Sequence, residues 1–590
     1  MRRLLRSGGP AVLLLLGLVL ARPTAAQHEG HDHGAGPRFN YLSEENREAA
    51  RTLAMQDFRG RMKPLDTHAR EIVMKIAKRE HFRGWEPIDL YLSWLTDPSF
   101  WFDRELIYVK HPGVKALLGI PEDAGEAHFG SPGRAVWVSA ASLLDGNQYV
   151  LADDVREALR TPDARRTKVQ RKLLKFDERF NIFWNVINGG GLKLYPIPGD
   201  ANRTWADFNE VREMDLPAEI GNAMDALLAG LRETDNTLIG DALAETRRLQ
   251  EAHGADVLPA AGALSAELWL NDKHPFRNVT LPYLVAFLLL IVAFFWGLGR
   301  RGGAAYPWRH PLYALGLLVY WAATAYHLYA FVLRWVASGR APLSNGYESL
   351  IFIALATAIA GVIFEIRDRR GSAAAVSALL TTVVLSVAML STFDPAIGPL
   401  VPVLASYWLI IHVTVITGSY GFLGLGSLLG GLTLLLHLLK GPGRAAVREA
   451  ILKLDRLQFR VLVTGLALLS IGTFLGGVWA NESWGRYWGW DPKETWSLVT
   501  ILVYAVVIHF RWIPSLNRPL VLATGGFAGI ASVVMTYFGV NYFLSGLHSY
   551  AQGDAARVPD WVYIISAAMF ALIVLAWIAD RVRSWEPERS

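Results

Sequence analysis

Hydrophobic positions divide the chain into two parts. Between about residues 40 and 270, apolar residues recur at spacings of three and four, which predicts amphipathic helices. After residue 279 they form long runs, which is typical of membrane-spanning helices. We therefore expect an α-helical protein, with a mainly helical soluble domain followed by a polytopic bundle of about nine spans. The helices expected in the soluble domain are Glu44–Met55, His68–Arg79, Val155–Leu159, Ala218–Leu231 and Thr237–Glu251.

Basic residues decide how the expected spans lie across the membrane. Arginine and lysine residues cluster after the first, third, fifth, seventh and ninth span, so these loops are predicted to be cytoplasmic by the positive-inside rule. The soluble domain and the stretch Trp479–Trp496 are then both outside. The expected spans are 280–299, 311–333, 348–366, 374–393, 407–439, 457–479, 497–511, 519–540 and 561–580.

The N-terminal residues indicate export. Residues 1–26 begin with Arg2, Arg3 and Arg6, followed by a short apolar core and Pro-Thr-Ala-Ala, which predicts a signal peptide cleaved after Ala26 or, alternatively, an uncleaved anchor. Residues 27–45 contain His28, His31 and His33, either a metal- or haem-collecting segment or a disordered polar tail. The remaining divisions are an exported domain at 46–275, a transmembrane domain at 280–580 and a cytoplasmic tail at 581–590.

Composition narrows the possible functions. The 590 residues include no cysteine, which excludes a disulfide, a thiolate metal site and haem bound covalently to this chain. A net charge of +5 fits basic cytoplasmic loops, and we find no nucleic-acid motif. The soluble domain contains no recognisable catalytic arrangement and is interpreted as a partner-docking module. The segment Gln56–Thr67 is predicted to be a loop that leads into a helix, with Asp66 or Thr67 as the N-cap.

The stretch Trp479–Trp496 carries the main functional signal. It contains five tryptophans, among them Trp484, Trp488 and Trp490, with Gly485 and Gly489 between them. Tryptophan is enriched at membrane interfaces, so an aromatic belt is one interpretation. The glycines favour another, a platform on which a flat ligand lies close to the backbone.

The end of this stretch predicts a helix start. Asp491 suits the N-cap position, Pro492 the first helical position and Glu494 the third. The platform is thereby attached to the seventh span. His509, 18 residues further on, lies roughly 27 Å down that helix, near its cytoplasmic end.

Two more histidines are expected near the platform. His412 begins the fifth span at the outer face, and His548 lies in the outer loop after the eighth. A single interfacial histidine is usually only a hydrogen-bonded polar group. Two histidines flanking an aromatic surface match what a flat iron-containing ligand needs, namely axial imidazoles and aromatic walls. Haem is the candidate.

The sequence resembles a known family at these residues. Trp-Gly-Arg-Tyr-Trp-Gly-Trp-Asp-Pro-Lys-Glu-Thr-Trp is similar to the tryptophan-rich WWD signature of haem-handling proteins in cytochrome c biogenesis, of the CcsA (ResC) type of system II. Ser406–His412, Gly339–Ser349 and Gly539–Tyr550 also resemble that branch. Gly60–Thr67 resembles the exported part of fused CcsB–CcsA synthetases.

The resemblance implies a function and a site. Ferrous haem b would enter from the cytoplasmic side of the inner membrane, with His509 as an intramembrane iron ligand. It would then be held outside between His412 and His548, against Trp484, Trp488, Trp490 and Asp491. The thiols of an apocytochrome c Cys-x-x-Cys-His motif would add to its vinyl groups, which makes the protein part of a haem lyase with no side-chain nucleophile. Thiol-reducing proteins are possible further partners.

Some assignments stay open. A signal-like segment stands where fused members have CcsB-type spans, so the partner of His509 is expected from a separate CcsB/ResB-like subunit or from His327. His310 and His437 are interpreted as interfacial. Arg334 and Arg340 are either haem-propionate ligands or ordinary interfacial arginines, and Glu348 is a helix-start charge. The alternative functions are a haem-binding electron-transfer or transport protein and a non-catalytic assembly scaffold.

Overall fold

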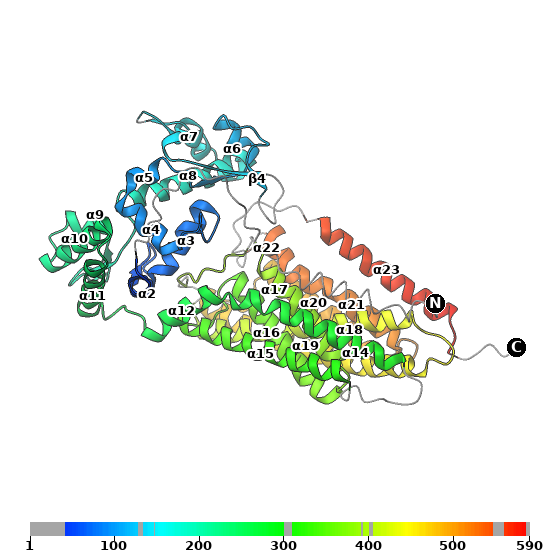
Figure 1. The fold of residues 1–590 in the computed structure, drawn as a ribbon. Helices are drawn as coiled ribbons and strands as arrows, with labels where there is room; N and C mark the ends of the chain where they lie inside the picture. Colours follow the sequence, from blue (N-terminus) through cyan, green and yellow to red (C-terminus); the bar gives the residue numbers. More distant parts are fainter. Residues whose placement is uncertain are drawn as a thin grey trace.

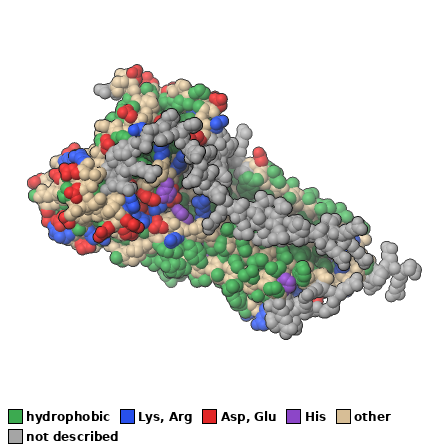
Figure 2. Space-filling model, viewed as in Figure 1, with side chains coloured by type: hydrophobic (Ala, Val, Ile, Leu, Met, Phe, Trp, Pro, Cys, Tyr) green, Lys and Arg blue, Asp and Glu red, His purple; other side chains and the backbone are tan. Residues whose placement is uncertain are grey.

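The computed structural model describes residues 42–127, 134–146, 148–299, 310–390, 393–400, 405–544, 546, 558 and 560–585. Two regions lie end to end (Figure 1). Residues 42–260, here the extramembrane region, sit at one end of a bundle of long helices. We call this end of the bundle proximal and the opposite end distal. Hydrophobic side chains cover the bundle, whereas charged side chains gather on the extramembrane region (Figure 2).

The extramembrane region is mainly helical, with short strands. Its helices are α2 Glu44–Arg51, α3 Leu65–Ala77, α4 Pro87–Thr96, α5 Pro98–Phe102, α6 Pro112–Leu117, α7 Ala152–Arg160, α8 Lys168–Ile187, α9 Phe208–Glu213, α10 Ala218–Glu233 and α11 Asn236–His253. Its antiparallel strand groups are β1 Ala54–Gln56 with β2 Met62–Pro64; β3 Ile107–Val109, β5 Arg134–Val138 and β4 Glu126–Ala127; β6 Leu144–Asp145 with β7 Gln148–Tyr149; and β8 Tyr195–Pro196 with β9 Trp205–Ala206.

One hydrophobic core joins these elements. It runs in sequence from Leu42 to Leu249, and α8 contributes Phe176, Phe180 and Phe183 at helical spacing. Thr167 and Gln170 form a capping box that begins α8. Each of the five expected helices coincides with a helix of the structure, although the first ends at Arg51 and β1 follows from Ala54; α4, α5, α6, α8, α9 and the strands were not predicted.

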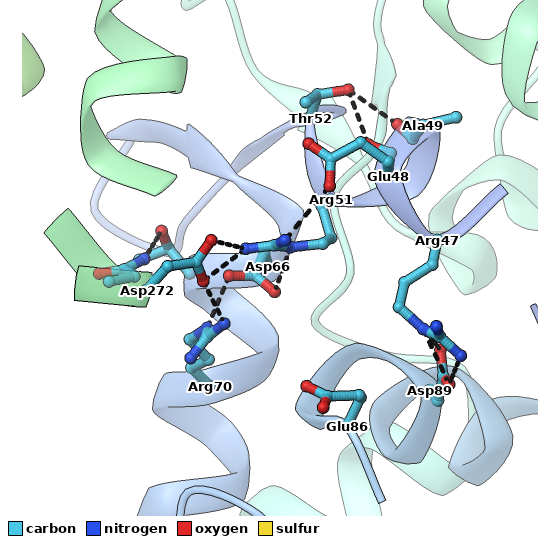
Figure 3. Close-up of polar contacts among 12 residues, drawn as sticks. Arg47, Glu48, Ala49, Arg51, Thr52, Asp66, Arg70, Glu86, Asp89 and Asp272 are labelled. Atoms are coloured by element: carbon cyan, nitrogen blue, oxygen red, sulfur yellow. Dashed lines mark hydrogen bonds and ion pairs between the residues drawn. The ribbon is translucent and has the colours of Figure 1, made fainter. Parts of the chain in front are cut away.

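The start of α3 corrects one prediction. Asp66 and Thr67 are not N-caps, because the helix begins at Leu65 and Pro64 occupies the cap position. Proline has no backbone N–H to lose and its fixed φ suits a helix entrance. The buried Asp66 carboxylate instead accepts hydrogen bonds from Arg51 Nε at 3.2 Å and Arg70 Nε at 2.6 Å (Figure 3).

Long helices occupy each expected span. Among the described residues, eight are long and apolar enough to cross a membrane, and α17 is shorter at 17 residues. The elements are α12 Ala261–Lys273, α13 Pro275–Asn278, α14 Thr280–Gly299, α15 Pro311–Ser338, α16 Gly346–Asp368, α17 Ser372–Ala388, α18 Tyr407–His437, α19 Ala445–Trp484, α20 Pro492–His509, α21 Pro519–Val534, the π-helix η6 Met535–Gly539, α22 Val540–Phe543 and α23 Asp560–Val582. The expected polytopic helical fold is confirmed.

The bundle contains two helix groups that pack differently. In the first helix group (α14–α17), buried tyrosines and hydroxyl groups join the helices; Tyr320 Oη, for example, lies 2.7 Å from both Ser377 Oγ and the Ala358 carbonyl oxygen. In the second helix group (α18–α22), glycines let the helices approach closely. A Cβ atom at Gly426 would meet Leu462, and one at Gly472 would meet Ile416.

Ion pairs join the extramembrane region to the bundle. Asp272, near the end of α12, accepts hydrogen bonds from Arg51 Nη2 at 2.6 Å and Arg70 Nη2 at 2.8 Å (Figure 3). Arg61 Nη2 lies 2.5 Å from the buried Glu267 carboxylate on the same helix. These contacts fix the orientation in which the chain enters α14.

Candidate functional site

A short loop at the proximal end connects α19 to α20. α19 continues through Trp484, so Trp479 and Trp484 are helical, and the connection is only the seven residues Gly485–Asp491. Gly485 ends α19 in a left-handed conformation with φ of 70°, which glycine adopts without strain. The glycines therefore have other roles than those expected: Gly485 is a helix C-cap, and the Arg486 guanidinium fills the space beside Gly489.

The predicted start of α20 is confirmed. Asp491 Oδ1 accepts a hydrogen bond from the Lys493 N–H at 2.9 Å, and Pro492 is the first helical residue. The Glu494 carboxylate in turn accepts a hydrogen bond from the Asp491 N–H at 3.2 Å. The same Glu494 oxygen also accepts from the Gly489 N–H at 2.8 Å. One carboxylate thus holds the backbone on both sides of Trp490.

Trp490 is the most unusual residue of the loop. Its φ is 57°, a conformation that is strained for a bulky side chain, and its side chain is 71% exposed. Its ring meets that of Trp488 edge to face, with centroids 5.8 Å apart. Strain of this kind persists only where neighbouring contacts enforce it, here those of Glu494, and such residues concentrate at functional sites.

Two tryptophans at the end of α19, Trp479 and Trp484, anchor the loop to the bundle. Trp479 is buried, and its ring lies 4.8 Å from that of Trp484. A Cβ atom at Gly477 would lie 3.0 Å from the Tyr487 carbonyl oxygen, so the loop backbone rests directly on α19. The loop is therefore firmly seated while Tyr487 and Trp490 project outward.

His412 lies near the start of α18, against the glycine-lined face of α19. Its Nδ1 is 2.7 Å from the Gly472 carbonyl oxygen, and a Cβ atom at Gly476 would lie 2.6 Å from its Cε1. A carbonyl oxygen only accepts, so Nδ1 carries the proton and Nε2 carries the lone pair. Histidines that bind metals are commonly oriented by a second nitrogen that donates in this way.

His509 has the same arrangement at the distal end. It is the last residue of α20, and its Nδ1 lies 2.6 Å from the Ala505 carbonyl oxygen of its own helix. Its ring is exposed at the bundle surface and meets Trp512 edge to face at 4.4 Å. Nε2 is again the nitrogen with the lone pair.

The segment after α22 approaches the loop from another side. Lys493 Nζ lies 3.2 Å from Asn541 Oδ1, which joins α20 to α22. A Cβ atom at Gly546 would lie 2.4 Å from Asp491 Oδ2, so Gly546 packs against the cap of α20. Gly546 is two positions before His548 in the sequence. His548 itself lies outside the described residues, as do the signal-like segment 1–26 and His28, His31 and His33.

His327 has a different environment. It is fully buried in α15, with its Nδ1 3.5 Å from Tyr283 Oη and its ring 5.7 Å from that of Phe276. It lies towards the proximal end, whereas His509 is at the distal end, so the structure does not bring these two histidines together. His437 lies at the distal end beside Asp580, 3.4 Å from its Oδ1.

Arg334 and Arg340 both contact Glu348, which is fully buried. Arg334 Nη2 lies 3.0 Å from Glu348 Oε1, and Arg340 Nη1 lies 3.4 Å from its Oε2. Arg334 also donates to the Pro395 carbonyl oxygen, and Arg340 to that of Gly398. The cluster holds two proximal loops together, a contact that sequence reasoning missed.

Sequence reasoning also missed the supporting residues Gly472, Gly476 and Asn541. A signal for the first two was present, since small residues four positions apart on a membrane helix indicate close packing. Among the described residues, no group of three or more His, Asp or Glu side chains forms a metal site.

Comparisons with known proteins identify relatives of this chain. The cytochrome c assembly protein family matches residues 343–548, which include the loop and His412. The chain is 38% identical over 325 residues to the cytochrome c biogenesis protein CcsA of Prochlorococcus marinus (strain MIT 9303), covering 49% of this chain and 98% of that protein. It is 40% identical to CcsA of Chlamydomonas reinhardtii over 227 residues, 37% of this chain and 63% of that protein.

A longer match includes the extramembrane region. The chain is 37% identical over 550 residues to protein NrfI of Wolinella succinogenes. This match covers 92% of the chain but only 59% of NrfI. The chain therefore spans less than two thirds of the length of that relative.

Proposed function

Because the chain belongs to the CcsA family of cytochrome c biogenesis proteins, we propose that it carries haem to the outer face of the cytoplasmic membrane and holds it there for covalent attachment to apocytochrome c. Haem b in its ferrous state is the substrate. The observation that carries the proposal is the orientation of His412, whose Nδ1 is fixed by the Gly472 carbonyl beside the tryptophan loop.

The outer site consists of His412 and His548 as axial iron ligands, with Trp484, Trp488, Trp490 and Asp491 forming its wall. The exposed, strained Trp490 supports this assignment, because its neighbours hold an apolar surface open at the proximal end. The contact of Gly546 with Asp491 supports the inclusion of the segment that leads to His548. Asp491 itself acts by positioning the loop.

Attachment needs no nucleophile from this chain. Each apocytochrome thiol adds across a vinyl C=C bond: sulfur bonds to the inner carbon, and the thiol hydrogen ends on the outer carbon. No net electron transfer occurs, and the iron stays ferrous. The protein contributes by coordinating the iron and positioning the vinyl groups. Its lyase activity therefore comes from holding the haem in the orientation in which the thiols can react.

His509 is proposed as the iron ligand at the cytoplasmic side. Its Nδ1 contact with Ala505 gives it the same orientation as His412, and its ring faces away from the bundle. An exposed ligand at the bundle surface suits a second histidine from a separate CcsB/ResB-like subunit better than it suits the buried His327. The positive-inside pattern of the loops supports the assignment of this end to the cytoplasmic side.

The test is covalent haem attachment in a bacterial host that lacks its own maturation system. The chain is co-expressed with a CcsB-like subunit and a Cys-x-x-Cys-His reporter, and haem staining is measured. We expect His412→Gly and His548→Gly to abolish staining and added imidazole to restore part of it, because imidazole replaces a ligand but not a packing contact. His253→Ala, on the extramembrane surface, is the matched control.

Other results would assign another function. Bound haem without attachment, with the partner supplied, would contradict the lyase role and favour haem transport or electron transfer. A purified wild-type protein with no bis-histidine haem spectrum would favour an assembly scaffold. Loss of staining in His412→Gly that imidazole does not restore would remove His412 from the ligand set.

A further inference from the structure

A cavity of about 260 Å³ lies at the distal end of the bundle, far from the tryptophan loop. It forms where α18 ends, α19 and α21 begin and α23 ends. Its polar lining includes His437, Lys440, Arg448, Arg518 and Asp580. None of these residues belongs to the proposed haem sites.

The charges of the cavity are unbalanced. The Asp580 carboxylate is already paired, because Lys440 Nζ lies 2.9 Å from its Oδ1 and Arg518 Nη2 lies 2.7 Å from its Oδ2. Arg448 is exposed, and its guanidinium forms no hydrogen bond or ion pair with any described residue. Among the described residues that line the cavity, three cations therefore face one carboxylate, which leaves an excess of two positive charges when His437 is neutral.

Apolar side chains form the rest of the lining. Ile451, Leu452 and Leu520 line the cavity, and Leu452 is 47% exposed. The Trp585 ring packs beneath Lys440, with Nζ 5.5 Å from its centroid. A tryptophan against a cation is typical of the headgroup level of a membrane. The cavity thus offers positive charge beside a surface that faces acyl chains.

We propose that this cavity binds the phosphate of an anionic phospholipid, with Arg448 as its principal charge contact. Basic pockets between membrane helices on the cytoplasmic side are suited to such headgroups. Asn517 at the rim supplies an amide for the glycerol or phosphate oxygens. Because Asp580 ties α23 to α18 and α21 at this point, the bound lipid also fills the space between these helices. This inference does not depend on haem binding.

The proposal is tested by lipid retention. The full-length protein is reconstituted in nanodiscs of phosphatidylcholine alone or with added phosphatidylglycerol, extracted into detergent, washed and examined by native mass spectrometry. We expect the wild type to retain phosphatidylglycerol in preference to phosphatidylcholine. In Arg448→Ala, retention should weaken about fivefold, the typical effect of one basic residue near a membrane surface.

Arg460→Ala is the matched control, because Arg460 is also exposed on α19 and has no side-chain ion pair with a described residue but does not line the cavity. It should retain lipid as the wild type does. Equal retention in Arg448→Ala and wild type would overturn the proposal, as would equal retention of the two lipids. Displacement of phosphatidylglycerol by millimolar inorganic phosphate would indicate a site for free phosphate instead. Unchanged lipid retention with weaker haem binding in Arg448→Ala would reassign the cavity to haem carboxylates.

Discussion

The two helix groups of the membrane region use the same residue types in opposite ways. In α14–α17, polar side chains are buried among the helices: His327 Nδ1 lies 3.5 Å from Tyr283 Oη while its Nε2 has no hydrogen-bond partner among the described residues, and Glu348 lies between two arginines. In α18–α22, glycines let α18 and the tryptophan loop pack closely on α19: His412 lies against Gly472 and Gly476, and Trp490 of the loop is exposed. The difference teaches that burial, more than residue type, separates a structural contact such as the Glu348 cluster from an exposed side chain such as Trp490.

The largest effect is expected in the first group, for Glu348→Ala. This change leaves Arg334 buried without its carboxylate, and removal of one partner from a buried ion pair costs about 3–5 kcal/mol. The free energy of unfolding, measured by SDS titration of the detergent-solubilised protein, should fall by that amount. Glu449→Ala is the control, since Glu449 is half exposed and pairs with Lys453 on the same helix. If Glu348→Ala lowered the free energy of unfolding as little as Glu449→Ala does, Glu348 would not be a buried structural charge.

A buried histidine in the extramembrane region extends the comparison to pH. Burial, with a smaller contribution from Lys63, lowers the pKa of His68 from 6.5 to about 3, and its Nε2 lies 3.1 Å from Tyr91 Oη. Below pH 6.5 the imidazole of His68 binds a proton in the unfolded chain but stays neutral in the folded chain. The contribution of the neutral His68 to the free energy of unfolding is therefore complete above pH 6.5 and is lost as the pH falls towards 3.

At about pH 5 this loss amounts to roughly 2 kcal/mol. His68→Gln keeps a polar partner for Tyr91 but does not titrate, so its unfolding midpoint should fall less between pH 7 and pH 5 than that of the wild type. His253→Ala, which removes an exposed histidine paired with Glu219, should leave the pH dependence nearly unchanged. Parallel pH profiles for His68→Gln and the wild type would rule out His68 as the titrating group.

In the second helix group, adding one methyl group at Gly476 should reduce haem attachment while leaving the stability of the protein almost unchanged. Gly476→Ala places a Cβ atom 2.6 Å from the His412 ring, so the imidazole must move. We expect haem attachment to fall about tenfold, or about 1.4 kcal/mol. Alanine is the better helix former, which offsets the crowding, so the unfolding midpoint should change little. Gly297→Ala, where no atom lies within 4 Å, should leave attachment intact; equal attachment in both variants would show that the position of His412 is not critical.

The sequence predicted features that are local. Long apolar runs predicted the membrane helices because the length of a run can be compared directly with the thickness of a bilayer. Asp491, Pro492 and Glu494 predicted the start of α20 because a capping box spans four residues. The end of α19 was placed too early, since the helix continues past its apolar run until Gly485 provides a C-cap.

Features that depend on distant residues were not predicted. β3 pairs with β5 across 31 positions, from Ile107 to Val138, and no local pattern specifies that pairing. The orientation of His412 depends on Gly472, 60 residues away, and Arg334 meets Glu348 only because α15 and α16 are antiparallel. The sequence thus indicated which polar and aromatic residues to consider, whereas packing decides which contacts each of them makes.

The smallest effect is expected where the same motif is solvated. Asp272 also lies between two arginines, Arg51 and Arg70, but its side chain is 37% exposed, and both arginines retain Asp66 as a partner when Asp272 is changed. Asp272→Asn should therefore cost less than about 1 kcal/mol, and less still at high salt, because exposed ion pairs are screened. SDS titration at low and high salt measures both. Asp66→Asn should cost more, since it involves the same arginines at a buried position. If Asp272→Asn lowered the free energy of unfolding as much as Glu348→Ala does, burial would not explain the difference between the Asp272 site and the Glu348 site.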